Sequence, residues 1–466
     1  MSDIPITIDE AAKALRAKEV SSVELTRAML ERADALDADL GVYLARFDEQ
    51  ALERAAQADA ELAAGTDLGP LHGVPIGVKD IIPAKEGPTT ANSLVLDPVW
   101  GEGKDGIVVE RIRAAGAVVM GKLTTMEFAI GLHDPEKPHP RPRNPWNIDT
   151  WPGGSSSGTG AGVAAGLFLA GFGTDTGGSI RIPAAYCGVS GLMPTFGRVP
   201  TAGCAPLGYS LDHIGPLTRK ARDCGHFLAA IAGDDPRDPY TVPTPPMAFG
   251  ETSSLKGMRI GYDRVNHFNE HADSELEPAF DASLASLREL GAELVEVELP
   301  LYQETLTALW VTMRSEAAAY HMPDFQTRWE DYYRFTRLMV GGGAVTTAAD
   351  YVLAQRVRRA AQRKLGALFD GVDAIVMPTA ATGAPSYAEI DSGGMANRMG
   401  SIFTSYWDAV GNPALVVPMG FSSESLPLSL QIAGRPFAEE AIVAVGDAYQ
   451  SVTDWHTRTP PVLAAA

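Results

Sequence analysis

Cysteine, basic charge and long apolar runs are all scarce in this chain. It has 3 cysteines among 466 residues, at Cys187, Cys204 and Cys224, and no CxxC pair, which suits reduced thiols in a reducing compartment. No segment holds the roughly 18 uninterrupted apolar residues that a membrane helix needs. The N-terminal sequence MSDIPITIDEAAKALRAKEV lacks the basic and apolar regions of a secretory signal. We therefore expect a cytoplasmic protein with no membrane as a partner.

Positive charge and metal-ligand patterns are also in short supply. Lysine and arginine number 38 against 58 aspartates and glutamates, which gives a formal net charge of −20. A field of that sign repels the phosphates of nucleic acids, so we expect no nucleic acid as a partner. None of the 9 histidines stands in an H-E-x-x-H pattern or at zinc spacing from a cysteine. We expect no bound metal.

The first half of the chain has the pattern of helices that alternate with strands. Residues 1–65 are expected to be helical, because Thr7 with Glu10 and Ser21 with Glu24 have the spacing of capping boxes. From residue 71, LHGVPIGVKDI predicts a buried strand that enters a turn, and GIVVERIRAAGAVVMGKLTT predicts a helix followed by a strand. Such alternation is typical of an α/β sheet.

A proline-rich polar stretch, 233–254, predicts a loop between two parts of the chain. Beyond it, LKGMRIGYD, DAIVMP and PALVVPMG predict strands, and residues 349–369 predict a long helix. Hydrophobic residues make up 45% of the whole chain and charged residues 21%, as in a folded globular protein.

Two familiar motifs occur without the context that they need. GSSSG, 154–158, has the G-x-S-x-G pattern of a hydrolase elbow with Ser156 at its centre, but a polar, proline-broken segment precedes it instead of a hydrophobic strand. GAGVAA, 160–165, matches a dinucleotide fingerprint, yet it follows the serine run and not a strand. We expect its small residues to let a helix pack closely.

The stretch GTDTGGSIRIP, 173–183, places Ser179 directly after two glycines. Consecutive glycines let backbone N–H groups point into a small space, which is how an oxyanion hole is built. The amides of Thr176, Gly177, Gly178 and Ser179 are the candidate donors. Taken alone, this pattern is also typical of a plain loop.

Lys79 ends the apolar segment GVPIGVKD and is a candidate base for a serine. Burial of a lysine lowers its pKa, so that it can accept a proton, and Ser-Lys pairs are known alternatives to Ser-His-Asp. The competing interpretation is a lysine at a strand end that reaches water or pairs with Asp80.

These motifs together resemble the amidase signature family. The resemblance is carried by GGSSSGTGAGVAAGLFLAGFGTDTGGSIRIPAAYCGVSGLMPT, 153–195, and by the lysine motif GVPIGVKD. It implies a single large α/β domain over 1–466, with a mixed twisted sheet between layers of helices. Within that domain, 1–65 is the N-terminal helical region, 71–232 the catalytic core, and 255–466 the remainder with variable helices around the substrate pocket.

The resemblance also assigns roles to individual residues. It implies a Ser-cisSer-Lys triad in which Ser179 is the nucleophile, Ser155 the bridging serine and Lys79 the base, with a cis peptide between Gly154 and Ser155. Asp175 and Arg181 match the family's motif, and we expect them to support the nucleophile's turn as an ion pair. We expect Ser157 to support it through its hydroxyl.

The function implied is amide hydrolysis through an acyl-enzyme, which yields a carboxylate and ammonia or an amine and needs no cofactor. Two alternatives stay open: the A subunit of a glutamine-dependent tRNA amidotransferase, and a non-catalytic amide-binding protein. Ile182 departs from the glutamine that such subunits usually carry after the arginine. The expected partner is a small-molecule amide, and a homodimer is compatible with the resemblance. The candidates for an apolar substrate pocket are Phe128, Trp310, Tyr406 and Trp407.

Overall fold

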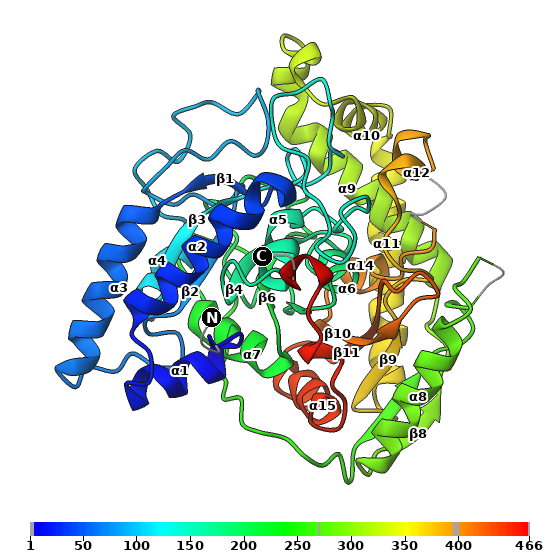
Figure 1. Ribbon diagram of the computed structural model, residues 1–466. Coiled ribbons are helices and arrows are strands. Elements are labelled where there is room, and N and C mark those ends of the chain that lie inside the picture. Colours follow the sequence, from blue (N-terminus) through cyan, green and yellow to red (C-terminus); the bar gives the residue numbers. More distant parts are fainter. Residues whose placement is uncertain (1–3, 269–270, 395–399, 465–466) are drawn as a thin grey trace.

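One mixed sheet of 11 strands runs through the molecule, in the order β1-β3-β2-β4-β6-β5-β10-β11-β9-β7-β8 (Figure 1). The computed structural model describes residues 4–268, 271–394 and 400–464. The strands are β1 Tyr43–Arg46, β2 Pro75–Lys79, β3 Val118–Leu123, β4 Ala170–Asp175, β5 Ser190–Met193, β6 His213–Thr218, β7 Arg259–Tyr262, β8 Glu293–Glu296, β9 Ala374–Pro378, β10 Ala414–Phe421 and β11 Pro427–Gly434.

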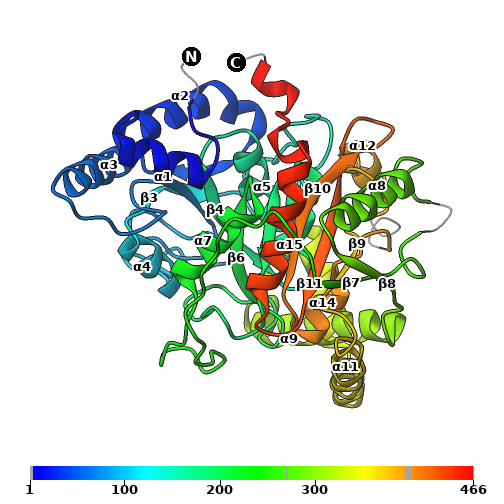
Figure 2. The same ribbon diagram turned by 90° about the horizontal axis from the view of Figure 1, so that it is seen from below.

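Helices occupy most of the intervals between these strands. They are α1 Ile8–Ala17, α2 Ser22–Leu40, α3 Asp48–Ala63, α4 Ile107–Ala114, α5 Ser157–Ala164, α6 Arg181–Cys187, α7 Ala221–Ile231, α8 Leu276–Glu289, α9 Tyr302–Phe325, α10 Arg334–Ala344, α11 Ala348–Leu368, α12 Tyr387–Asp391, α14 Ser405–Val410 and α15 Glu439–Val452, with short 3-10 turns at Trp329–Asp331, Trp455–Thr457 and Pro461–Ala464. The α1–α3 group and the α8–α11 group lie at opposite sides of the molecule (Figures 1 and 2).

The α/β class expected from the sequence is confirmed, and so are most of its elements. Thr7 caps α1 through the Glu10 N–H, and Ser21 forms a complete capping box with Glu24 at the start of α2. The helical N-terminal region also contains a strand that the sequence did not predict, β1, which pairs antiparallel with β3. Its residues, YLAR, do not alternate between apolar and polar, so they give no period-2 pattern.

Strands that precede the predicted loop at 233–254 and strands that follow it belong to the same sheet. Strands β5 and β6, which precede the loop, join β10, which follows it, because β5 pairs antiparallel with both β6 and β10. Helix α15 packs against α7 and so also joins the two parts. The chain is therefore one domain. Among the described residues, no helix has the length and apolar character to cross a membrane.

Helix α5 packs with unusual closeness, as its small residues predict. A Cβ at Gly158 would lie 2.6 Å from the Val42 carbonyl oxygen, and a Cβ at Gly162 would lie 2.2 Å from the ring of Phe168. The GAGVAA motif therefore serves packing, and the helix lies directly against the central strands.

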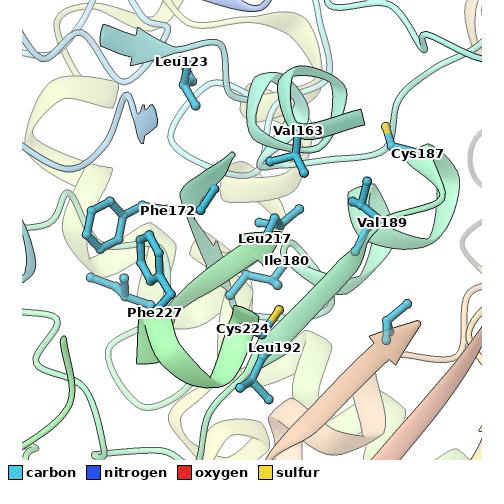
Figure 3. Packing of buried hydrophobic residues seen from close by; sticks show 14 of the residues in the cluster. Leu123, Val163, Phe172, Ile180, Cys187, Val189, Leu192, Leu217, Cys224 and Phe227 are labelled. Carbon is cyan, nitrogen blue, oxygen red and sulfur yellow. The ribbon is translucent and has the colours of Figure 1, made fainter. Parts of the chain in front are cut away.

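The core around these strands is filled from both sides. In Figure 3, Val163 of α5 lies above the strands and Phe227 of α7 lies below them. Phe227 meets Phe172 of β4 edge to face, with ring centroids 4.8 Å apart. Edge-to-face pairs of this kind add to the burial of apolar area, so the strands that carry the site residues lie on a densely packed support.

Candidate active site

The candidate active site forms where two neighbouring parallel strands end. Strand β2 pairs in parallel with β4, with Ile76 opposite Ala170, so Lys79 at the end of β2 lies beside Thr174 near the end of β4. The Lys79 Nζ donates to the Thr174 Oγ1 at 2.7 Å. The carboxyl ends of parallel strands are where α/β proteins commonly bind ligands.

The same ammonium reaches the serine run. The Lys79 Nζ lies 2.6 Å from the Ser155 Oγ and donates to it. The Ser155 carbonyl is held by the Thr125 hydroxyl at 2.9 Å and the Met126 N–H at 3.1 Å, and the Gly154–Ser155 peptide is cis. The structure therefore brings Lys79 together with the first serine of the run, and it agrees with the cis peptide that the resemblance implies.

The neighbouring serine has a different task. The Ser156 Oγ accepts from the Thr174 N–H at 3.2 Å, and the Ser156 N–H donates to the Ser179 carbonyl at 3.2 Å. Ser156 thus ties β4 and the Ser179 turn to the serine run. Its hydroxyl is buried and occupied, which does not suit the nucleophile of a hydrolase elbow.

Lys79 is fully buried among hydroxyl groups. Burial lowers the pKa of Lys79 to about 7, although the charges of Cys204, Asp175 and Asp212 act in the opposite direction. The alternative of a Lys79–Asp80 pair is wrong, because the Asp80 Oδ1 pairs with Lys122 at 3.0 Å. No carboxylate of the described residues lies within ion-pair distance of the Lys79 Nζ.

Ser179 lies in a turn that requires glycine. Gly178 has φ +135°, and a Cβ there would lie 2.1 Å from the Thr404 Oγ1. The Gly177 carbonyl accepts from the hydroxyls of Thr404 at 2.7 Å and Ser405 at 3.0 Å. Ser179 is half-buried and opens into a cavity. Thr404 and Ser405 were missed by sequence reasoning, since nothing local marks a contact over more than 200 residues.

The Asp175 carboxylate changes the expected set of oxyanion donors. It accepts the Gly178 N–H, and also the Ile180 N–H at 3.2 Å. The expectation that Gly178 contributes to the oxyanion hole is therefore wrong for this structure, because its donor is already used inside the turn. The amides of Thr176, Gly177 and Ser179 stay predicted donors.

A buried ion-pair network supports the turn. The Arg181 Nε donates to the Asp175 Oδ2 at 2.9 Å, and its Nη2 donates to the Asp408 Oδ2 at 2.5 Å. Burial would raise the pKa of Asp175, but the Arg181 guanidinium outweighs burial and lowers that pKa to about 2. Burial raises the pKa of Asp408 well above its usual range. The expected pairing of Asp175 with Arg181 is observed, and Asp408 is a further partner that the sequence did not indicate.

Ser157 also lies where support is needed. Its hydroxyl donates to the Gly153 carbonyl at 2.7 Å, from the first residue of α5 back to the segment before the helix. This bond braces the glycine pair that precedes Ser155, in agreement with the supporting position expected for Ser157.

The cavity in front of Ser179 has a volume of about 430 Å³ and is largely apolar. Of the four predicted pocket aromatics, only Trp310 lines it. The expectation is wrong for the other three, which are core residues: Phe128 packs on His321, Tyr406 stacks on Tyr302, and Trp407 is fully buried. Large aromatic side chains fill cores more often than pockets. The residues from Leu306 to Arg314 on α9 and from Phe335 to Met339 on α10 supply much of the wall.

A second cavity, of about 230 Å³, lies on the other side of Thr176. Thr174, Cys204 and Asp212 line it, and the Asp212 Oδ1 accepts the Thr176 hydroxyl at 2.6 Å. In the described part of the chain, no three histidine, cysteine, aspartate or glutamate side chains gather in a way that could hold a metal ion.

The comparison with known proteins fits this geometry. The sequence profile of the family described as Amidase matches residues 24–443. The chain belongs to the amidase family. The resemblance to amidase signature enzymes is thereby confirmed, as is the expectation that this amidase is an enzyme of the amidohydrolase type, acting on amide C–N bonds.

Relatives of this amidase match it over its whole length. A curated relative, the A subunit of the glutamyl-tRNA(Gln) amidotransferase of Geobacter metallireducens, is 39% identical, with 97% of this chain and 98% of the relative covered. The native peptide amidase from Stenotrophomonas maltophilia superposes with a TM-score of 0.83 at 30% identity, with 98% and 99% covered. The A subunit of the glutamyl-tRNA(Gln) amidotransferase of Thermotoga maritima gives a TM-score of 0.80 at 29% identity, with 97% and 96% covered.

These relatives correct the expectation about partners. We expected a small amide as the only ligand, with no nucleic acid and at most a second copy of the chain. That expectation is contradicted, because the curated relatives are named as subunits of an enzyme that acts on glutamyl-tRNA(Gln). The net charge describes the whole molecule, and it does not exclude a protein partner or a local surface that meets RNA.

Proposed function

We propose that this amidase hydrolyses an amide C–N bond through an acyl-enzyme on Ser179. The observation that carries the proposal is the 2.6 Å contact between the Lys79 Nζ and the Ser155 Oγ, inside a site that lowers the pKa of Lys79 to about 7. A lysine with that pKa is about half in the neutral form at pH 7, the form that can accept a proton.

In the proposed first step, neutral Lys79 accepts the Ser155 hydroxyl proton while Ser155 accepts the proton of Ser179. The Ser179 Oγ attacks the amide carbonyl carbon, and the electron pair of the carbonyl moves to its oxygen. The N–H groups of Thr176, Gly177 and Ser179 are proposed to hold that oxyanion.

The second step breaks the C–N bond and releases the nitrogen. The proton returns from Lys79 through Ser155 to the amide nitrogen, which leaves as ammonia or an amine. Water then attacks the acyl-enzyme, with its proton taken by the same relay, and Ser179 is regenerated as the carboxylate leaves. Lys79, acting through Ser155, thus serves first as general base and then as general acid, while Ser179 is the nucleophile.

Two substrate classes are supported by different observations. The full-length similarity to the A subunit of glutamyl-tRNA(Gln) amidotransferase favours release of ammonia from glutamine inside a larger enzyme. The apolar lining of the cavity, with Trp310, Leu306 and Met313, favours an amide with a hydrocarbon acyl part. The non-catalytic alternative loses its support, since the family consists of amidohydrolases.

The nucleophile is tested with a serine-directed fluorophosphonate and peptide mass spectrometry. We expect labelling at Ser179 in the wild type, a loss of labelling in Lys79→Ala, and retained labelling in Ser156→Ala. Labelling at Ser156, or none on folded wild-type protein, would contradict the proposed nucleophile. Equal labelling of wild type and Lys79→Ala would contradict the relay.

The substrate class is tested by comparing ammonia release from glutamine with release from aliphatic amides. The purified chain is assayed alone and again after addition of glutamyl-tRNA(Gln) and the other amidotransferase subunits of the organism that encodes it. Glutamine turnover that rises on addition supports a role within an amidotransferase. Fast turnover of aliphatic amides by the chain alone, without such a rise, supports the second class.

A further inference from the structure

One charged side chain lines the cavity in front of Ser179. Among the described residues of that lining, Arg314 is the only one with a formal charge. It lies on α9, one helical turn after Trp310, and the two helices that flank the cavity, α9 and α10, run side by side (Figure 1). A single cationic side chain in a largely apolar wall is typical of a site that binds an anionic group of a ligand.

The guanidinium of Arg314 has no anionic partner within the described residues. Its Cζ lies over the Trp310 ring, 5.4 Å from the centroid, and its Nη2 meets only the Met339 sulfur, at 3.8 Å. Its Nε is buried and lacks a hydrogen-bond partner. No acidic side chain of the described chain lies within ion-pair distance of it. An arginine held in this way keeps most of its donors free.

The position of Arg314 is fixed by its packing. The helix α10 approaches so closely that a Cβ at Gly343 would lie 1.9 Å from the Arg314 carbonyl oxygen. Gly342 of α10 also borders the Arg314 side chain, since a Cβ there would lie 3.7 Å from the Arg314 Cδ, an ordinary contact distance. The contact of the guanidinium with the Trp310 ring, 5.4 Å from the Cζ to the centroid, further limits the positions of the side chain.

We propose that Arg314 binds a carboxylate of the substrate, so that this amidase prefers amides whose acyl chain ends in a carboxylate. An unpaired guanidinium in an apolar cavity is stabilised by an anion, and a carboxylate matches its fork with two parallel hydrogen bonds. The hydrocarbon part of such a chain would lie against the apolar lining. The inference rests on the proposed function, and glutamine is one member of this substrate class.

The test compares two amides of equal chain length, hexanamide and the monoamide of hexanedioic acid. We expect the wild type to have the higher kcat/KM for the carboxylated amide. Arg314→Gln should lower that value by about 10- to 100-fold, the factor that corresponds to one charge-assisted hydrogen bond, and should leave hexanamide within about 3-fold. Arg314→Lys should restore part of the loss, mainly in KM.

The matched control is Arg337→Gln on α10. The Cζ of Arg337 also lies over a tryptophan ring, 5.8 Å from the Trp329 centroid, but Arg337 pairs with Glu330 at 2.6 Å and does not line the cavity. We expect Arg337→Gln to leave kcat/KM unchanged for both amides. Equal losses for both amides in Arg314→Gln, or no loss for either, would overturn the carboxylate subsite.

A second measurement separates this inference from the proposed function. Hexanedioate should slow fluorophosphonate labelling of Ser179 in the wild type, and should slow it much less in Arg314→Gln. Labelling that hexanedioate does not slow in either protein overturns the subsite while the nucleophile stands. Failure of Ser179 to label at all overturns the proposed function, and the inference falls with it.

Discussion

Two buried lysines in this protein differ in whether a carboxylate lies beside the ammonium group, and this difference affects how readily each loses its proton. Lys79 and Lys122 are both buried, and burial lowers the pKa of each. Lys122 is compensated by the Asp80 carboxylate at 3.0 Å and donates to the Thr89 hydroxyl at 2.6 Å. Among the residues that the structure describes, the Lys79 Nζ donates only to the hydroxyls of Ser155 and Thr174. A hydroxyl stabilises an ammonium less than a carboxylate does, so Lys79 is the one suited to exchange a proton.

The pKa of Lys79 leads to a prediction about pH. Because the base must be neutral and its pKa is lowered to about 7, the rate of fluorophosphonate labelling of Ser179 should rise as pH increases through about 7 and then level off. Labelling rates are measured between pH 5 and pH 9 (about the range in which lysine at an ordinary pKa would stay protonated), with circular dichroism as the control for folding. A rate that still rises at pH 9 without levelling off would mean that Lys79 keeps an ordinary pKa.

At the scale of elements, α5 positions the serine run because its glycines allow the helix backbone to approach its neighbours closely. Its glycines let the helix lie against the Val42 carbonyl and the Phe168 ring, at separations where a Cβ could not fit. Ser156 and Ser157, at its first turn, bond to β4 and to Gly153. The helix therefore holds Ser155 in position as part of the rigid core.

The packing of α5 predicts opposite effects for two glycine-to-alanine changes. Gly162→Ala should lower the free energy of unfolding by about 1–3 kcal/mol, because its Cβ would lie 2.2 Å from the buried Phe168 ring. The control is Gly366→Ala on α11, where nothing lies within 4 Å of the Cβ. It should raise that free energy by about 0.5–1 kcal/mol, since alanine is the better helix former. Urea unfolding measures both, and a neutral Gly162→Ala would contradict the packing.

At the scale of the whole molecule, one sheet joins segments that the sequence separates. Strands from 71–232 and from 255–466 meet at the junction of β5 with β10, and α15 packs against α7. Arg181 links the Ser179 turn on one side of the loop to Asp408 and Gln431 on the other. The site is therefore complete only when both parts are present in one fold.

This continuity predicts that cutting the connecting loop leaves the molecule intact. A protease site is inserted after the exposed Pro245 and cleaved in native buffer. The two fragments should elute together in size-exclusion chromatography and keep Ser179 labelling, because the backbone pairing of β5 with β10 and the buried ion pairs remain. Fragments that separate without denaturant would show that the parts are independent domains. Uncut protein carrying the same insertion is the control.

Local patterns were enough to predict the class of fold and to single out Lys79 and Ser179 as candidate site residues. Capping spacing marked the start of α2, an apolar run ending in lysine marked β2, and paired glycines marked the turn before Ser179. These are properties of neighbouring residues, and neighbours in sequence interact however the rest of the chain folds. Ser155, by contrast, was chosen over Ser156 through the family resemblance, and the contact with Lys79 agrees with that choice.

Only the tertiary structure decided which of several similar groups faces the cavity and which is already paired. The commitment of the Gly178 N–H to Asp175, the burial of Tyr406 and Trp407 in the core, and the lone guanidinium of Arg314 depend on how distant elements meet. Thr404 and Asp408 contact the Ser179 turn and Arg181 across more than 200 residues of sequence. Such contacts leave no periodicity in the sequence, because a hydrogen bond or a cavity wall depends on positions in space and not on separation along the chain.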